Sequence, residues 1–255
     1  MFKKEISISI VTYNSSDEIR VVLNSIFSCD SAEHLDVYVV DNNSSDNTTD
    51  IIEKEFPGAI LIKSNKNLGF GAAHNIVINK VTSKYHIIVN PDIEIGLESI
   101  GKLEKYMDEN KEVVITTPKI INFDGTEQFL PKKYPKMKYF LGGRFENNGK
   151  IFKKWRDEYT LKSENINKPI DIDFCTGCFM FTRSKEIKEC GGFDERYFLH
   201  FEDADLTREM QKFGRTVYNP YISVKHKWKR DNVRNKKIFL IAIQSMFKYF
   251  IKWSI

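Results

Sequence analysis

Short apolar runs alternate with amphipathic stretches through the first half of the chain. Runs rich in β-branched and aromatic residues predict strands, and these lie at 6–12, 37–41, 59–63 and 85–89. Stretches whose apolar residues recur every three or four positions predict helices, and these lie at 19–26, 46–56 and 72–81. Because strands and helices alternate, we expect an α/β fold with a mostly parallel central sheet flanked by helices.

The second half of the chain is less regular. After a strand-like run at 113–116 the periodicity fades, and residues 131–168 predict a basic, loop-rich excursion. This excursion is either a solvated surface or one that meets anionic phosphate or lipid. Further elements are predicted at 170–174, at 201–214 as a helix that buries Leu206, Met210 and Phe213, at 217–224 as a strand and at 236–255 as a helix.

Composition narrows the class of protein. Of 255 residues, 39 are Lys or Arg and 35 are Asp or Glu, so the formal charge of +4 is too small to indicate a nucleic-acid partner. A hydrophobic content of 41% is typical of a globular protein. Phe2-Lys3-Lys4-Glu5 leads directly into the first strand without an apolar leader, which predicts a cytoplasmic protein.

The positive charge is unevenly distributed and is concentrated near the C-terminus. Residues 225–252 hold nine basic residues and one acid. The predicted helix at 236–255 is apolar around most of its circumference, but Gln244 and lysines interrupt it, so it makes a poor membrane span. Lysines that reach the interface and Trp253 at head-group depth would suit a helix lying on a membrane. The alternatives are that this helix packs on the domain or on a second subunit.

Polar residues follow each of the first four predicted strands. They are Thr12-Tyr13-Asn14, Asp41-Asn42-Asn43, the Asn- and Gly-rich segment 65–71, and Asn90-Pro91-Asp92. Such residues are also ordinary turn formers, so each group alone is weak. Their common position at the carboxyl ends of parallel strands, however, predicts a ligand site at that edge. Asp92 would meet a divalent cation carrying a diphosphate there, or would only cap the following segment.

Carboxylates cluster again at Glu202, Asp203 and Asp205. Helical spacing predicts that Asp203 points inward with Leu206 and Met210, and that Asp205 points outward. An inward carboxylate in the first helical turn is stabilised as an anion and can act as a general base. The alternative is that Glu202 and Asp203 only cap the helix.

Two further groups have open roles. His226 follows a predicted strand in a cationic setting, where a role toward metal or phosphate competes with a structural one. Cys175 and Cys178 have the spacing of a zinc or redox motif, but no second ligand pair is evident. We prefer the interpretation that they are two small residues on a tight loop.

Together these segments resemble glycosyltransferase family 2, the inverting nucleotide-sugar transferases of the Rossmann-like GT-A fold. The similar stretches are Val11–Ser15, Val39–Thr48, Asn65–Asn75, Val89–Asp92, Gly191–Asp194 and Phe201–Leu206. They occur in family order within residues 6–230. The Asn-Pro-Asp motif and the basic, aromatic tail after His226 are most similar to bacterial rhamnosyltransferases of polysaccharide assembly. The resemblance implies one catalytic domain over 1–230, with a nucleotide-sugar half to 116, an acceptor half over 117–230 and a helical extension over 231–255.

The resemblance also implies roles for individual residues. Thr12, Tyr13, Asn14, Asp41, Asn67, Gly69 and Asn90 would bind the nucleotide-sugar donor. Asp92 and His226 would hold Mg²⁺ or Mn²⁺, and Asp203 would be the catalytic base. The acceptor would contact Glu202, Thr176, Gly177, Trp228 and Arg230. The sequence departs from the usual metal motif at Asn90, where the family has its first Asp.

The implied reaction transfers a sugar, rhamnose from dTDP-rhamnose, to a saccharide or to a polyprenyl-diphosphate-linked glycan in surface polysaccharide synthesis. A UDP-hexose or UDP-N-acetylhexosamine donor is the alternative within the same fold. Two other classes rank lower: a non-catalytic sugar-binding module, and a nucleotidyltransferase, whose Gly- and Arg-containing loop the segment Thr12–Ser16 lacks. The implied partners are the donor, the glycan acceptor, and either the inner face of the cell membrane or a second subunit at 236–255.

Overall fold

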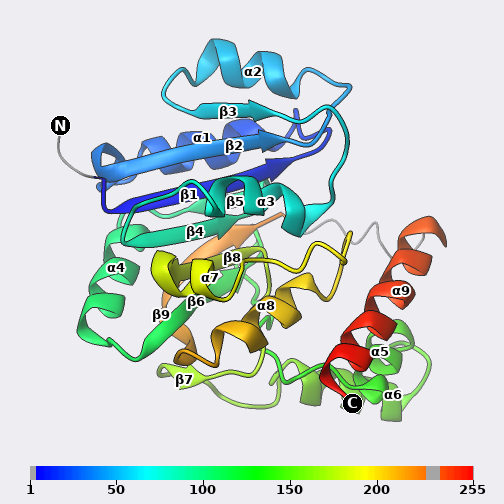
Figure 1. Cartoon of the computed structure of the whole chain (residues 1–255). Coiled ribbons are helices and arrows are strands. Elements are labelled where there is room, and N and C mark those ends of the chain that lie inside the picture. The colour runs from blue at the N-terminus through cyan, green and yellow to red at the C-terminus, as the bar shows by residue number, and fades with distance from the viewer. Residues whose placement is uncertain (1–3, 228–235, 255) are drawn as a thin grey trace.

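A central sheet runs through the molecule (Figure 1). The computed structural model of the chain describes residues 4–227 and 236–254. In this part of the chain the strands are β1 Ile6–Thr12, β2 Leu35–Asp41, β3 Ile60–Lys63, β4 Tyr85–Val89, β5 Ile93–Ile95, β6 Val113–Ile121, β7 Ile170–Asp171, β8 Phe179–Arg183 and β9 Arg215–His226. Their order is β3-β2-β1-β4-β8-β6-β9-β5, and β7 pairs with β9 off this path. The predicted α/β fold is confirmed.

The N-terminal half follows the predicted alternation closely. β1 lies parallel to both β2 and β4, and β2 lies parallel to β3. The first helices are α1 Ile19–Phe27, η1 Ala32–His34, α2 Thr48–Glu55 and α3 Phe70–Ile78. All five residues of β4 are buried, as expected for a strand covered on both faces. The parallel order brings the ends of β1, β2 and β4 to one edge of the sheet.

The C-terminal half departs from simple alternation. β8 lies antiparallel between β4 and β6, and β9 pairs parallel with β6 but antiparallel with β5. Its helices are α4 Ser99–Glu109, α7 Ser184–Glu189 and α8 Glu202–Met210. The predicted burial of Leu206 and Met210 is confirmed, but that of Phe213 is wrong. Because α8 ends at Met210, Phe213 lies beyond the helix and is exposed.

The predicted loop-rich excursion contains two helices, α5 Met137–Arg144 and α6 Lys150–Tyr159. They pack closely because Gly142 has no side chain: a Cβ there would lie 2.9 Å from the Cβ of Trp155. Tyr139 of α5 stacks on Tyr159 of α6, with ring centroids 4.9 Å apart. The prediction of a loop-rich segment is therefore wrong for residues 137–144 and 150–159, which form a packed pair of helices.

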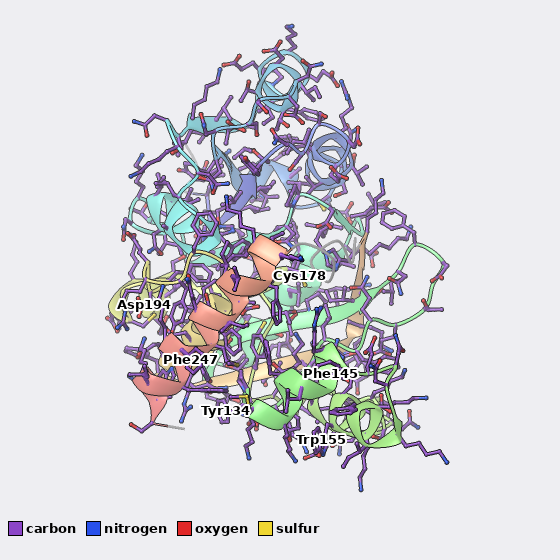
Figure 2. The ribbon with its side chains drawn as sticks, turned by 90° about the vertical axis from the view of Figure 1, so that its right-hand side faces the viewer. Tyr134, Phe145, Trp155, Cys178, Asp194 and Phe247 are labelled. Atoms are coloured by element: carbon purple, nitrogen blue, oxygen red, sulfur yellow. The ribbon has the colours of Figure 1, made fainter. Side chains whose placement is uncertain are left out.

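The last helix, α9 Lys236–Trp253, lies beside α5 and α6 at one end of the molecule (Figures 1 and 2). Its buried residues are Ser245, Met246 and Tyr249. The Ser245 hydroxyl donates to the Leu199 carbonyl at 2.9 Å, and Tyr249 contacts the Phe201 ring. Of the alternatives left by the sequence, packing on the domain is confirmed for this face of the helix. Among the described helices, none is long and apolar enough to cross a membrane.

Candidate active site

The turns after β1 and β2 are tied together by their own side chains. The buried Thr12 hydroxyl donates to Asp41 Oδ1 at 3.2 Å, and the Ser44 amide donates to Asp41 Oδ2 at 3.0 Å. Asn14 has a left-handed backbone, φ 53°, and its Oδ1 accepts from the Ser45 amide at 2.8 Å. Tyr13 is 53% exposed, so its ring is the accessible group of this turn. The arrangement is a rigid polar edge with one aromatic ring on its surface.

The Asn- and Gly-rich loop before α3 is organised by Asn42, a residue for which the sequence predicts no separate role. Its Nδ2 donates to Asn67 Oδ1 and to the Gly69 carbonyl, both at 3.0 Å, and its Oδ1 accepts from the Leu68 amide at 2.8 Å. Gly69 has φ 86°, and a Cβ there would lie 2.3 Å from the Phe198 carbonyl oxygen. Asn67 and Gly69 therefore hold the loop against the segment that leads into α8.

Asp92 and His226 meet because β5 and β9 pair antiparallel, with Ile93 opposite His226. Asp92 Oδ1 lies 3.2 Å from His226 Nε2. Gln128, which the sequence reasoning missed, accepts from His226 Nδ1 through Oε1 at 2.8 Å. Its amide nitrogen donates to the His226 carbonyl at 2.8 Å, which fixes which end of the amide faces the ring.

This arrangement assigns the proton of the neutral imidazole to Nδ1. In that neutral form the lone pair of Nε2 points toward the Asp92 carboxylate, so two electron-pair donors converge, whereas a protonated ring would donate to Asp92 from Nε2. A divalent cation bound by both would resolve that repulsion, and oxygen and imidazole ligands suit Mn²⁺ or Mg²⁺. The residues present therefore fit the metal that the sequence predicted, although the described residues contain no cluster of three His, Cys, Asp or Glu side chains.

Asp203 is placed by a turn of unusual geometry at the start of α8. His200 and Phe201 both have φ 68°. This left-handed conformation costs about 1–3 kcal/mol for each residue that carries a Cβ. The Gly177 amide donates to Asp203 Oδ2 at 3.1 Å, and the Ala204 amide donates to Oδ1 at 2.9 Å. Two backbone amides and the helix N-terminus stabilise the anion that a general base requires.

Glu202 differs from its neighbour. It is only 4% exposed, and its Oε2 has no hydrogen-bond partner in the described residues. Burial and then the charge of Asp203 raise the pKa of Glu202 well above its ordinary value. Burial therefore favours the neutral form of this side chain, and Oε2 is a buried oxygen without a hydrogen-bond partner among the described residues.

One cavity of about 330 Å³ unites most of the predicted site. Of the sequence-predicted residues, it is lined by Asn90, Asp92, Thr176, Gly177, Glu202, Asp203 and His226. Six others lie outside its lining: Thr12 and Asp41 end β1 and β2, and Tyr13, Asn14, Asn67 and Gly69 lie in the loops after β1 and β3. Trp228 and Arg230 fall outside the described residues. The metal pair and the candidate base thus share one space.

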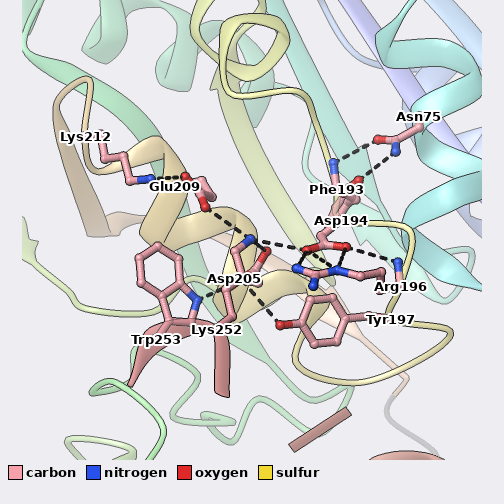
Figure 3. A network of polar contacts seen from close by, with 10 residues as sticks. All are labelled: Asn75, Phe193, Asp194, Arg196, Tyr197, Asp205, Glu209, Lys212, Lys252 and Trp253. Atoms are coloured by element: carbon pink, nitrogen blue, oxygen red, sulfur yellow. Dashed lines mark hydrogen bonds and ion pairs between the residues drawn. The ribbon is translucent and has the colours of Figure 1, made fainter. Parts of the chain in front are cut away.

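The predicted outward orientation of Asp205 is wrong. Its side chain is buried beneath α9, where Lys252 Nζ donates to Oδ2 at 2.7 Å and Trp253 Nε1 donates to Oδ1 at 2.8 Å (Figure 3). Lys252 also pairs with Asp194 and Glu209, at 3.3 and 3.1 Å. The spacing misled because α9 covers the helix face that the sequence assigned to solvent. Trp253 itself is half-buried with its indole N–H bonded to Asp205, and its position at lipid head-group depth stays a prediction.

Cys175 and Cys178 are both buried. Burial raises the pKa of the Cys178 thiol to about 11 and that of Cys175 well above its ordinary value. Metal binding and thiol exchange need the thiolate, so this environment disfavours both. The loop interpretation agrees with these surroundings.

Comparison with known proteins adds independent findings. A family model described as "Glycosyl transferase family 2" matches residues 7–191. The chain is 27% identical over 231 residues to the N-acetylglucosaminyl-diphospho-decaprenol L-rhamnosyltransferase of Mycobacterium tuberculosis. The match covers 85% of this chain and 74% of the relative. The chain is 26% identical over 253 residues to Rhamnosyltransferase WbbL of Escherichia coli, which covers 95% and 91%.

Solved structures show the same fold. A mannosyltransferase from Pyrobaculum calidifontis in complex with GDP-Man and Mn²⁺ superposes with a TM-score of 0.66 at 15% identity, over 99% of this chain and 64% of that one. The S. aureus protein TarS, residues 1–349 with UDP-GlcNAc, gives 0.63 at 17% identity, over 96% and 66%. The chain spans 39% of a longer TarS structure. These likenesses establish the GT-A architecture.

Proposed function

The chain belongs to glycosyltransferase family 2, and on that premise we propose that it transfers rhamnose from dTDP-rhamnose to a lipid-linked saccharide with inversion at the anomeric carbon. The observation that carries this proposal is the shared cavity, in which Asp203 faces the same space as Asp92 and His226. The names of the relatives from M. tuberculosis and E. coli support rhamnose as the sugar.

In the proposed reaction, Asp203 removes the proton from an acceptor hydroxyl. That oxygen attacks the anomeric carbon as the bond from this carbon to the diphosphate oxygen breaks, and the electron pair leaves with the nucleoside diphosphate. Asp92 and His226 would hold Mg²⁺ or Mn²⁺, which would neutralise charge on the diphosphate. Asn90 carries no charge at the position of the usual first Asp, so Asp92 and His226 supply the metal contacts that this motif retains.

The other predicted donor residues have a separate task in this proposal. Tyr13 would stack on the base, and the rigid edge around Asp41 would bind the ribose through the remaining lone pairs of that carboxylate. Thr176 and Gly177 would meet the acceptor beside Asp203. Trp228 and Arg230 keep their proposed acceptor role on the strength of the resemblance alone.

We further propose that α9 rests on the inner surface of the cell membrane. Leu240, Phe247 and Ile251 recur along one side of the helix and are 60%, 55% and 78% exposed (Figure 2 labels Phe247). Lys236 and Lys237 are exposed at the start of the same helix. Apolar residues beside lysines suit a helix lying on anionic lipid. Homodimerisation through this face is the competing outcome, and size measured by light scattering distinguishes the two.

Transfer from a panel of nucleotide sugars to a synthetic lipid-diphosphate saccharide tests the donor. We expect turnover with dTDP-rhamnose and thermal stabilisation by dTDP that grows when Mn²⁺ is added. A ligand at 100 times its Kd adds about 2.7 kcal/mol to the free energy of unfolding. Turnover with a UDP-hexose in place of dTDP-rhamnose would establish the alternative donor, and activity that survives EDTA would remove Asp92 and His226 from a metal role.

A further inference from the structure

A second cavity adjoins the first and has no role in the account above. It has a volume of about 330 Å³ and lies among α5, α6, α8 and α9. Lys132, His200, Glu202 and Asp203 line both cavities and so form their common wall. A molecule in the second cavity therefore also reaches the candidate base, whereas Asp92 and His226 line only the first cavity.

The lining of this cavity is strongly cationic. Lys132, Lys136, Arg144 and Arg156 all contribute to it. The carboxyl groups that line it are Glu202, whose pKa burial raises, and Asp203, whose oxygens accept from two backbone amides. Four cationic side chains therefore face two carboxyl groups in this lining.

Lys132 is the clearest member of this group. Its Nζ lies over the rings of Phe174 and Tyr159, 4.7 and 5.6 Å from the two centroids. The Lys132 backbone carbonyl accepts from the Phe174 amide at 3.0 Å, but Nζ makes no hydrogen bond or ion pair with the described residues. Burial and the neighbouring charge of Arg156 lower the pKa of Lys132 to about 8. An ammonium held between two cavities on aromatic faces, and repelled by a second cation, is a site that favours an anion.

Two neighbouring cations have partners of their own. Arg144 packs on the Phe239 ring of α9, with its Cζ 4.7 Å from the centroid. Arg156 lies 3.7 Å from Glu146, measured from Nε to Oε2. Lys138 gives the contrast: it forms two bonds to Glu158, at 2.9 and 3.0 Å, and does not line the cavity.

We propose that this cavity binds the diphosphate of the acceptor, between the sugar that receives the transferred residue and the lipid. The cations would bind the phosphate oxygens, and the sugar hydroxyls would lie beside Asp203. The α9 residues Ile238, Phe239 and Ala242 form an apolar wall through which the lipid would leave toward the exposed face of that helix. This inference rests on the proposed function and names its acceptor subsite.

Calorimetric binding without donor tests the proposal on the full chain. The probes are N-acetylglucosaminyl diphosphate bearing a short alkyl chain, the matching monophosphate, and the matching alkyl glycoside. We expect the diphosphate to bind at least tenfold more tightly than the glycoside. Lys132→Met, which keeps an aliphatic stem over the two rings, is expected to weaken diphosphate binding by tenfold or more. Lys136→Gln changes an exposed residue and gives a second variant with little risk to folding.

Lys153→Gln is the matched control. Lys153 is exposed on the same helix as Arg156 but lies outside the cavity lining, so its loss removes one charge without removing a contact. Equal binding of the three probes would overturn the proposal, as would equal weakening by Lys132→Met and Lys153→Gln. Monophosphate binding as tight as diphosphate binding would overturn the assignment of a diphosphate. Titration of dTDP with Mn²⁺ on each variant separates this result from the proposed function, since failure of the donor to bind wild type would count against the latter alone.

Discussion

The polar edge that we propose binds the donor, here called the donor edge, differs from the cavity that we propose binds the acceptor, here called the acceptor cavity, in how its polar groups are partnered. At the ends of β1 and β2, Thr12, Asn14 and Asp41 bind one another's loops through bonds of 2.8–3.2 Å. In the cavity between α5 and α9, Lys132 has only aromatic rings beneath its ammonium. The first region is rigid before any ligand arrives, whereas the second carries charge that a ligand must satisfy.

This difference suggests how each region obtains specificity. A preformed edge selects a ligand by shape, because its donors and acceptors have little freedom to adjust. A cationic cavity selects by charge and keeps its strongest interactions for the anion. Asp203 lies at the junction of the two cavities, where two backbone amides hold its carboxylate.

The largest expected effect is at this junction. Asp203→Asn keeps the size of the side chain but removes the base, so we expect kcat to fall by about 10²-fold or more, the usual share of general-base catalysis. Binding of dTDP with Mn²⁺ should remain within about twofold, which steady-state kinetics and calorimetry together can check. A variant with near-normal kcat would show that another group accepts the proton.

The next-largest effect is expected at Gln128, whose side chain orients His226 of the Asp92–His226 pair. Gln128→Leu removes the group that holds the proton on His226 Nδ1, and loss of such a partner typically weakens metal affinity by about 10–100-fold. Gln128→Glu keeps an acceptor for Nδ1 and should retain most of the affinity. Mn²⁺ titration in the presence of dTDP measures both. Equal affinity in Gln128→Leu and wild type would mean that the tautomer does not matter.

Local sequence predicted the donor edge better than the acceptor side, and the reason is physical. The polar groups at Thr12, Asp41 and Asp92 follow buried strands, and parallel pairing alone brings strand ends together. The side chain that positions His226 comes instead from residue 128, which no spacing rule connects to residue 226. Its signal in the sequence was a single glutamine in a loop.

Asp205 is a second case in which a contact between distant parts of the chain could not be predicted from local sequence. Helical periodicity identifies which residues share a face, but it does not say whether a later segment covers that face. Here α9, nearly fifty residues further along the chain, covers it, so a carboxylate predicted for solvent became the buried partner of Lys252 and Trp253. The helices α5 and α6 were missed because their apolar faces pack mainly on each other and on aromatic neighbours.

The third effect tests whether Asp205 serves structure while Asp203 serves chemistry. Asp205→Asn leaves Lys252 near Asp194 and Glu209 but removes its closest carboxylate, so we expect a loss of about 1–3 kcal/mol in the free energy of unfolding. Urea denaturation measures this loss, and kcat of the folded variant should stay within about threefold of wild type. A hundredfold fall in kcat with unchanged stability would reverse the two roles.

The fourth effect comes from histidines buried under the donor half. Ser9 links His74 Nδ1 at 2.7 Å to His86 Nε2 at 2.9 Å, and burial lowers the pKa of His86 to about 3. In the unfolded chain a histidine has an ordinary pKa of about 6.5 and binds a proton below that pH, whereas the buried histidine of the folded chain stays neutral. Stability is therefore complete above about pH 6.5 and should fall by about 1.4 kcal/mol per pH unit per buried histidine below it.

Denaturation at several pH values checks this slope with a matched pair of variants. His86→Gln should make the fall of stability with acid shallower, because it removes one group that binds a proton only in the unfolded chain. His34→Gln changes an exposed histidine and should leave the slope as it is. If both variants kept the wild-type slope, the acid sensitivity would belong to carboxylates and not to this buried network.

The smallest effect on folding is expected on the outer face of α9. Phe247→Ser exposes less apolar surface without touching the buried residues Met246 and Tyr249, so the free energy of unfolding should change by no more than about 0.5 kcal/mol. Cosedimentation with anionic vesicles should nevertheless fall several-fold, because the membrane interaction depends on that surface. Tyr249→Ser on the opposite face should instead destabilise the protein. Unchanged vesicle binding together with a smaller particle in light scattering would assign the exposed face to a second subunit, and α9 would then join two acceptor cavities instead of placing each one at a lipid surface.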